Sequence, residues 1–220
     1  MKKLTFYSSG IAVTAIVLIL LSIASCKKTE QVVTPAPPGN EFLTTVIFRG
    51  INTVAPFDTT TAIWRDLNPN NTNLQPDTSK AILNFKKNAT YACNVYILDE
   101  SATTNFGASN LGALVPLNFN INNLPSTTVN VTTEIRARQN YHLVCFDMSG
   151  GITPNLTVMR TDYDTNTPAL QVGLNDNAAT VNASTGRMEM TLHHQPNVKN
   201  GSCGPGTADF DITYTVNILP

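Results

Sequence analysis

The chain has 220 residues, of which 42% are hydrophobic and only 13% charged, and its 14 Lys and Arg nearly balance its 15 Asp and Glu. This balance argues against a nucleic-acid-binding protein, which needs a basic excess to meet phosphates, and against a charge-rich disordered chain. Four Cys are too few for a small disulfide-rich scaffold, while the length allows one or two domains with a substantial core.

The N-terminus has the pattern of a secretion signal. Two Lys precede an uncharged run at 11–24, which is shorter than the roughly 20 residues of a membrane-spanning helix. The run ends at 23–26 in Ile-Ala-Ser-Cys, the lipobox pattern of bacterial lipoproteins, in which the Cys thiol accepts a diacylglycerol. We therefore expect a signal peptide at 1–25 and a lipidated Cys26 that anchors the protein to a membrane. An ordinary secretory signal or a signal anchor is the alternative.

A tether follows the lipidated residue. Residues 27–40 are polar and then Pro-rich, a composition that favours extended, semi-rigid chain. Lys27 stands where an inner-membrane retention signal of enteric bacteria would have Asp, so we expect the outer membrane, on its periplasmic face or at the cell surface. The expected division of the chain is a signal peptide at 1–25, the lipidated Cys with its tether at 26–40, and a single domain at 41–220.

From residue 41 onward, short segments alternate between apolar and polar residues with period two, which predicts β-strands. The predicted strands are 43–48, 61–67, 81–85, 90–98, 115–121, 129–135, 141–146, 156–159, 187–193 and 210–218. No window shows a helical period, and clusters of Asn, Asp, Gly, Pro and Ser separate the strands. We therefore expect an all-β fold, an antiparallel β-sandwich of immunoglobulin-like or Greek-key type. Two small sandwiches that divide near 149–151 are the alternative to one domain.

The alternation also predicts which side chains face the core. In each of two strands, 90–98 and 210–218, every second residue is apolar or aromatic. The core residues predicted in this way are Tyr91, Cys93, Val95, Ile97, Phe210, Ile212, Tyr214, Val216 and Ile218. Asp209 and Asp211 then belong to the solvent face of the last strand.

Several stretches carry a family resemblance. They are TTV at 44–46, WRDL at 64–67, NATYACNVYILDE at 88–100, TLHHQP at 191–196 and ADFDIT at 208–213, in this order behind the lipobox. With them the chain resembles a family of small uncharacterised lipoproteins of Bacteroidota type, over residues 44–218. Such proteins are sometimes described as having a type 1 periplasmic-binding fold, but that fold alternates strands with helices and this chain shows no helical pattern. The resemblance therefore implies a β-rich envelope domain and no particular activity.

Three Cys remain once Cys26 is lipidated, in a compartment that permits disulfides. Because three is odd, at least one thiol stays free. Cys93 and Cys145 lie in predicted strands and Cys203 lies in a Gly-rich loop. We expect buried, independent thiols, with a Cys93–Cys145 bridge as the alternative, and no neighbouring base indicates a catalytic cysteine.

Two of the three His, His142 and His194, stand at positions that match the family pattern. We expect His194 to end a core-facing row as a hydrogen-bonded side chain. The alternative is a polar cluster of His142, His194, Asp209 and Asp211. Met188 and Met190 share the face of His194, and with Cys203 they would supply soft copper ligands. Blue-copper proteins, however, hold Cys, His and Met in one short segment, which this chain does not.

Two loops place oxygen side chains at alternate positions, as calcium loops do. These residues are Asp66, Asn68 and Asn70 in the first loop and Asp162, Asp164 and Asn166 in the second. Neither loop has the Gly or the Glu of an EF-hand, and Asn and Asp are also ordinary turn residues. We therefore expect turns, with calcium as the one cofactor to test.

No GxSxG, HExxH, phosphate loop or dinucleotide fingerprint is present, so we do not expect an enzyme. We expect a lipid-anchored cell-envelope protein with a structural or binding role. Its partners would be the membrane, through the lipid, and an envelope protein or a glycan, but no nucleic acid. The alternative is a calcium-stabilised carbohydrate- or protein-binding module at the cell surface. A hydrolase would be favoured only by a cleft that gathers His194 with carboxylates.

Overall fold

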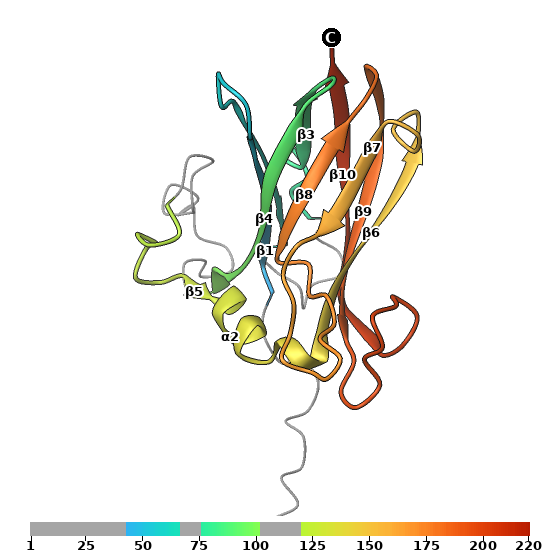
Figure 1. Cartoon of the computed structure of the whole chain (residues 1–220). Coiled ribbons are helices and arrows are strands. Elements are labelled where there is room, and N and C mark those ends of the chain that lie inside the picture. The colour runs from blue at the N-terminus through green and yellow to red at the C-terminus, as the bar shows by residue number, and fades with distance from the viewer. Residues whose placement is uncertain (1–42, 67–75, 102–119) are drawn as a thin grey trace, which may run out of the picture. The chain divides into compact units, whose positions relative to one another are not determined.

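Residues with period-two alternation form the strands of two facing β-sheets in the computed structural model, which describes residues 43–66, 76–101 and 120–220 (Figure 1). The strands are β1 (Thr45–Asn52), β2 (Thr59–Arg65), β3 (Ile82–Lys86), β4 (Thr90–Asp99), β5 (Val129–Asn130), β6 (His142–Gly150), β7 (Leu156–Arg160), β8 (Asn175–Thr180), β9 (Ser184–His194) and β10 (Thr207–Leu219). A short helix α2 (Val131–Ala137) and a 3-10 turn (Gln139–Tyr141) connect β5 to β6.

The two sheets share a single core. One sheet has the order β2-β1-β4-β8-β7, with β5 paired to β4, and the other has the order β3-β10-β9-β6. The expected all-β sandwich is confirmed, and every described strand pair is antiparallel except β3 with β10, which is parallel. Strands from before and after residue 150 pair with one another, as β4 does with β8. The described strands therefore form one sandwich rather than two.

The core residues predicted from alternation are buried. Tyr91, Cys93, Val95 and Ile97 are each at most 2% exposed, and the inward row of β10 from Phe210 to Ile218 is at most 8% exposed. Both rows belong to one hydrophobic cluster together with residues of β1, β6 and β9. Period two thus located the inner face of both sheets.

The described elements differ from the predicted strands in two places, and a third predicted strand cannot be compared. The strand predicted at 129–135 is wrong, because only Val129–Asn130 is extended and Val131–Ala137 is helical. The buried residues of this helix, Val131, Thr132 and Ile135, are spaced for a helical face. The strand β8 was not predicted, because its buried row includes Asp176 and Thr180. Most of the strand predicted at 115–121 lies outside the described residues.

The expected signal peptide, Cys26 and tether also lie outside the described residues. Within the three described ranges, no helix is both long and apolar enough to cross a membrane.

Candidate functional site

Three segments from different parts of the sequence meet at one end of the sandwich, the lower end in Figure 1. They are the segment 139–142, which includes the turn before β6 and its first residue, the segment 161–174 between β7 and β8, and the segment 194–209, which runs from the last residue of β9 into the start of β10. We call these residues the loop end. Backbone bonds join them: Gln195 N–H donates to Tyr141 O over 2.6 Å. Gln195 is fully buried, and its side-chain amide donates to Ser202 O and Pro205 O.

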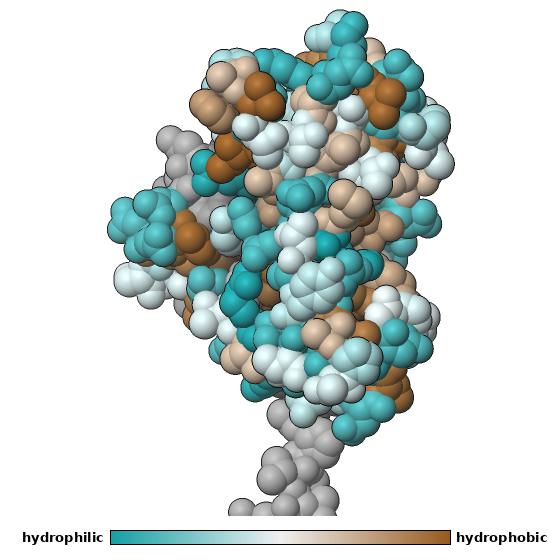
Figure 2. Space-filling model, viewed as in Figure 1, coloured by the Kyte–Doolittle hydropathy of each residue, from teal (hydrophilic) through white to brown (hydrophobic). Residues whose placement is uncertain are grey.

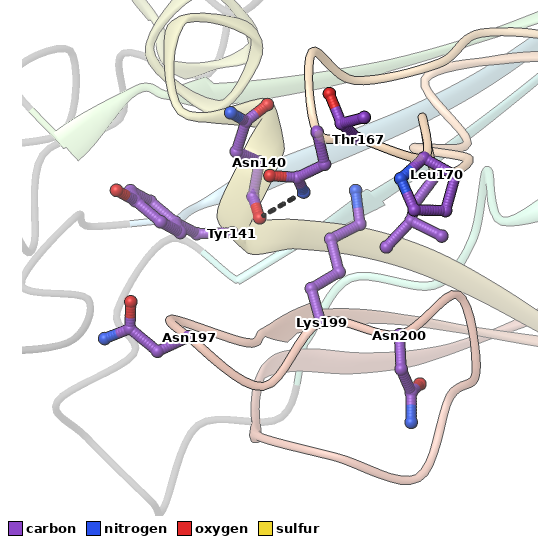
Figure 3. Close-up of a pocket in the computed structure, with 9 residues that line it drawn as sticks. Asn140, Tyr141, Thr167, Leu170, Asn197, Lys199 and Asn200 are labelled. Atoms are coloured by element: carbon purple, nitrogen blue, oxygen red, sulfur yellow. Dashed lines mark hydrogen bonds between the residues drawn. The ribbon is translucent and has the colours of Figure 1, made fainter.

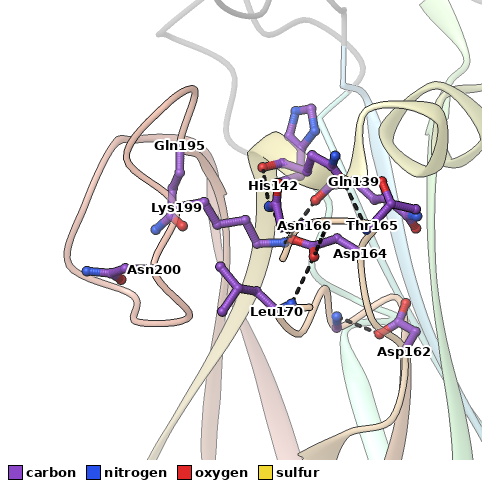
Figure 4. A network of polar contacts seen from close by, with 12 residues as sticks. Gln139, His142, Asp162, Asp164, Thr165, Asn166, Leu170, Gln195, Lys199 and Asn200 are labelled. Carbon is purple, nitrogen blue, oxygen red and sulfur yellow. Dashed lines mark hydrogen bonds and ion pairs between the residues drawn. The ribbon is translucent and has the colours of Figure 1, made fainter. Parts of the chain in front are cut away.

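A buried ion pair connects two of the segments (Figure 4). Lys199 Nζ lies 2.8 Å from Asp164 Oδ2 and also donates to Gln139 O over 2.8 Å, and the two side chains are 2% and 0% exposed. Asp164 also accepts N–H bonds from Asn166 and Leu170. Burial alone would raise the pKa of the Asp164 carboxyl, but the bonds from Leu170, Lys199 and Asn166 lower it below its ordinary value. The pair therefore stays ionised and fixes the loops.

A cleft of about 510 Å³ opens beside this ion pair (Figure 3). Its polar lining comes from all three segments and consists of Asn140, Tyr141, Asn166, Thr167, Asn197, Lys199 and Asn200. Pro168 and Leu170 add an apolar part. The described lining contains amides, the Thr167 hydroxyl, the Lys199 ammonium and one aromatic ring but no His, Cys, Asp or Glu, so it offers hydrogen bonds in both senses.

Next to the cleft, the structure brings His142, His194 and Asp209 together. His142 and His194 lie directly opposite each other in the β6–β9 pair, and their rings stack with centroids 4.9 Å apart. Asp209 reaches them through an irregularity in β10: Ala208 pairs with His193 and Phe210 with Leu192, so Asp209 is the extra residue of a bulge. One ligand atom from each of the three side chains lies within 4.8 Å of the others.

The environment sets the protonation of this cluster. His142 is 4% exposed, and its Nδ1 must donate to Arg138 O, 3.0 Å away, because a carbonyl oxygen only accepts. Burial lowers the pKa of His142 to about 4, so the ring is neutral at pH 7. Burial also raises the pKa of Asp209, although the nearby His194 and His193 oppose the shift. The remaining nitrogen of His142, Nε2, lies 3.8 Å from Asp209 Oδ2.

Asp211, the fourth residue of the predicted cluster, is not part of it. Its side chain is on the exposed face of β10, opposite Thr191, where its charge raises the pKa of the exposed Glu189. The prediction that Asp211 faces solvent is confirmed. The same prediction for Asp209 is wrong, because the bulge turns its side chain partly inward. The cleft lining includes neither His194 nor a carboxylate among the described residues, so the arrangement named for a hydrolase is not assembled there.

Two of the predicted calcium residues, Asp162 and Asp164, use their carboxylate oxygens in contacts within the protein. Asp162 accepts N–H bonds from Gly173 and Leu174, and Asp164 is paired with Lys199. A calcium ion in this loop would have to displace the ammonium of Lys199. In the other loop, Asp66 follows β2 and donates its N–H to Thr44 O, while Asn68 and Asn70 lie outside the described residues. Calcium binding stays a prediction at both loops.

The expected independent thiols and the alternative Cys93–Cys145 bridge are both wrong, although one thiol does stay free. Cys145 of β6 forms a disulfide with Cys203 of the loop end, 58 residues later, and Cys93 is the free thiol. Cys145 faces the loop at the end of β9 rather than the strand that holds Cys93. Because its sulfur is in the disulfide, Cys203 cannot supply a thiolate ligand to copper. Met188 and Met190 are fully buried in the core.

Sequence reasoning missed the residues that shape the loop end, above all Lys199 and Gln195. Lys199 is separated from Asp164 by more than thirty residues, so only the closed sandwich brings them together. The cluster of Asn around Gly201 was a turn signal and gave no sign of a cleft. Comparisons with family models, with curated proteins and with solved structures give no match for this chain.

Proposed function

We propose that this chain is a lipid-anchored cell-envelope protein that binds a neutral, polar ligand at its loop end and carries out no catalysis. The cleft lined by amides and Tyr141 is the observation that carries the binding role. The lipobox that ends in Cys26 carries the location, for which the outer membrane is the preferred site. The Cys145–Cys203 disulfide supports export, since disulfides persist in oxidising compartments outside the cytoplasm.

The chemistry of the cleft favours a carbohydrate. Side-chain amides donate and accept hydrogen bonds, as sugar hydroxyls require, and the ring of Tyr141, 43% exposed, offers a surface on which an apolar sugar face can stack. The charge of Lys199 is balanced by Asp164, so the cleft has no free charge that selects an ionic ligand. On the face shown in Figure 2, hydrophobic residues occur as separate small groups, which argues against a broad apolar partner there.

The cleft is also preorganised for binding. The Lys199–Asp164 pair, the amide of Gln195 and the Cys145–Cys203 bridge each fix a loop that contributes to the lining. Because these loops are held before a ligand arrives, little ordering entropy is lost on binding. An anchored envelope protein with such a cleft would hold polymer at the membrane surface.

The test is binding of the mature protein, in detergent micelles, to a panel of immobilised neutral glycans. We expect Tyr141→Ala to weaken binding at least about tenfold, through loss of the stacking surface. Asn197→Gly should also weaken it, and this variant keeps the left-handed backbone of Asn197, whose φ is 61°.

Tyr163→Ala is the matched control, because Tyr163 is an exposed aromatic residue of the same loop end that does not line the cleft. The proposal fails if no glycan in the panel binds. It also fails if Tyr141→Ala and Asn197→Gly both bind as well as the original protein, or if Tyr163→Ala weakens binding as much as Tyr141→Ala does.

A further inference from the structure

We propose that His142, His194 and Asp209 bind one divalent transition-metal ion of the zinc type. This site is separate from the glycan cleft and does not depend on it. The first argument is the donor set: two imidazole nitrogens and one carboxylate oxygen are ligands that zinc and its neighbours prefer, whereas calcium takes oxygen ligands.

His142 is already oriented as a metal ligand. Its Nδ1–H donates to Arg138 O, which lies at the C-terminal end of α2, and that bond fixes both the tautomer and the plane of the ring. Metal-bound histidines commonly have such a partner on the nitrogen that does not bind the metal. The lone pair of Nε2 is then left facing Asp209.

The third argument is an unsatisfied contact. Nε2 of His142 and Oδ2 of Asp209 lie 3.8 Å apart, and both are acceptors when the ring is neutral and the carboxylate is ionised. Across the described residues, no N–H or O–H group donates a hydrogen bond to the Asp209 carboxylate, whose side chain is only 13% exposed. The acceptor atoms of the two side chains therefore border one space, and a metal ion placed there would contact both.

Metal coordination also fixes the distance between the ligand atoms. A tetrahedral ion with bonds of about 2.1 Å separates its ligands by roughly 3.4 Å. The present separations of up to 4.8 Å must therefore shorten when an ion binds. Because the rings are stacked, one of them must tilt for the lone pairs to converge, and His194 is the less buried of the two. The protein supplies three ligands, so a solvent molecule completes the coordination.

The fold provides for this arrangement at a specific point. The β-bulge in β10 exists only at Asp209 in that strand's pairing with β9, and without it the alternation would aim Asp209 to solvent beside Asp211. Bulges often re-aim a side chain at functional sites.

The experiment is a calorimetric titration of zinc(II) into the mature protein after removal of metal by a chelator. We expect one ion per chain, with affinity in the micromolar range or tighter, and a zinc-dependent rise in melting temperature. His194→Ala and Asp209→Asn should each weaken binding at least about 100-fold and abolish the rise. Both residues are partly exposed, so these variants avoid the folding risk of replacing buried His142.

His193→Ala is the control, because His193 is adjacent in sequence but does not belong to the cluster. It should bind zinc as the original protein does. Cobalt(II) provides a second readout, since its visible spectrum reports tetrahedral coordination by nitrogen and oxygen. The proposal is overturned if zinc gives no binding to folded protein, if both cluster variants still bind, if His193→Ala loses binding as fully as His194→Ala, or if calcium binds as tightly as zinc.

Discussion

At the scale of single residues, Asp176 is the side chain least suited to its place. It is 2% exposed in β8, and neither carboxyl oxygen has a hydrogen-bond partner. Burial raises its pKa to about 8, with a further increase from the charge of Asp162 and partial relief from Arg160. At neutral pH the folded protein therefore keeps Asp176 protonated, while the unfolded chain ionises it.

This difference makes the free energy of unfolding depend on pH. A carboxyl whose pKa is raised on folding contributes its full stability below the ordinary value of 3.8, and that stability is lost as pH rises towards about 8. We predict that Asp176→Asn removes this loss. Its stability relative to the original protein should grow with pH by up to about 1.4 kcal/mol per pH unit.

Urea unfolding at a series of pH values between about 5 and 8 measures the effect. Asp147→Asn is the control, because Asp147 is exposed on β6. A stability difference between Asp176→Asn and the original protein that stays constant with pH would show that Asp176 is ionised in the fold.

Buried side chains could be predicted wherever apolar and polar residues alternate along a strand. The inward rows of β4 and β10 could be predicted, because burial in a strand follows alternation directly. His142 and His194 could be named as a pair, but Asp209 and Asp211 could not be told apart, since a bulge leaves no trace in composition. Partners such as Lys199 and Asp164 depend on how the loops close, and the sequence does not encode that locally.

Among the elements, α2 packs Val131 and Ile135 into the core and is hydrogen-bonded to β4 through one side chain. Thr132 is buried, and its hydroxyl accepts a bond from Ile97 N–H over 2.7 Å and donates one to Ile97 O over 3.1 Å. The helix thus satisfies backbone groups of β4 where no neighbouring strand does so. These hydrogen bonds and the buried apolar residues of α2 favour the helix, although Val, Thr and Ile prefer strands.

We predict that Thr132→Val destabilises the fold by about 1–3 kcal/mol, because it preserves shape but leaves the Ile97 backbone groups buried without partners. Thr133→Val makes the same chemical change on the exposed side of α2 and should cost little. Denaturant midpoints of the two variants provide the comparison. Equal midpoints would mean that the Thr132 hydroxyl does not dock the helix.

The two elements that sequence reasoning missed have related causes. The segment 131–137 is rich in Val, Thr and Ile, which favour strands, so the tertiary contact of Thr132 prevails over local propensity. Strand β8 reads as a polar turn because Asn175, Asp176 and Asn177 open it, and its place between β4 and β7 comes from pairing alone. Both errors arise where packing overrides the local signal.

At the scale of the whole molecule, the Cys145–Cys203 disulfide joins β6 to the loop end across 58 residues. A crosslink over a loop of this length restricts the unfolded chain, and we predict that Cys203→Ser lowers the free energy of unfolding by about 2–4 kcal/mol. Reductant should destabilise the original protein by a similar amount and leave the variant unchanged. Equal urea midpoints for the oxidised and reduced forms would contradict the bridge.

The overall architecture was the most predictable level, because ten segments of alternating residues separated by turn clusters have few solutions other than a sandwich. The order of strands was not predictable. The parallel pairing of β3 with β10 joins segments more than a hundred residues apart, and only the completed sheet shows it.

We propose that this sandwich acts while anchored to a membrane, and the mass of its N-terminal peptide decides whether the anchor exists. The full chain would be expressed in a Gram-negative host, recovered from the outer-membrane fraction and digested for mass spectrometry. We expect a chain that begins at Cys26 and carries a diacylglyceryl group. The Cys26→Ser variant should leave the membrane fraction, whereas the control variant Lys28→Ala should stay in it. An unmodified Cys26, or a Cys26→Ser protein that remains with the membrane, would contradict it.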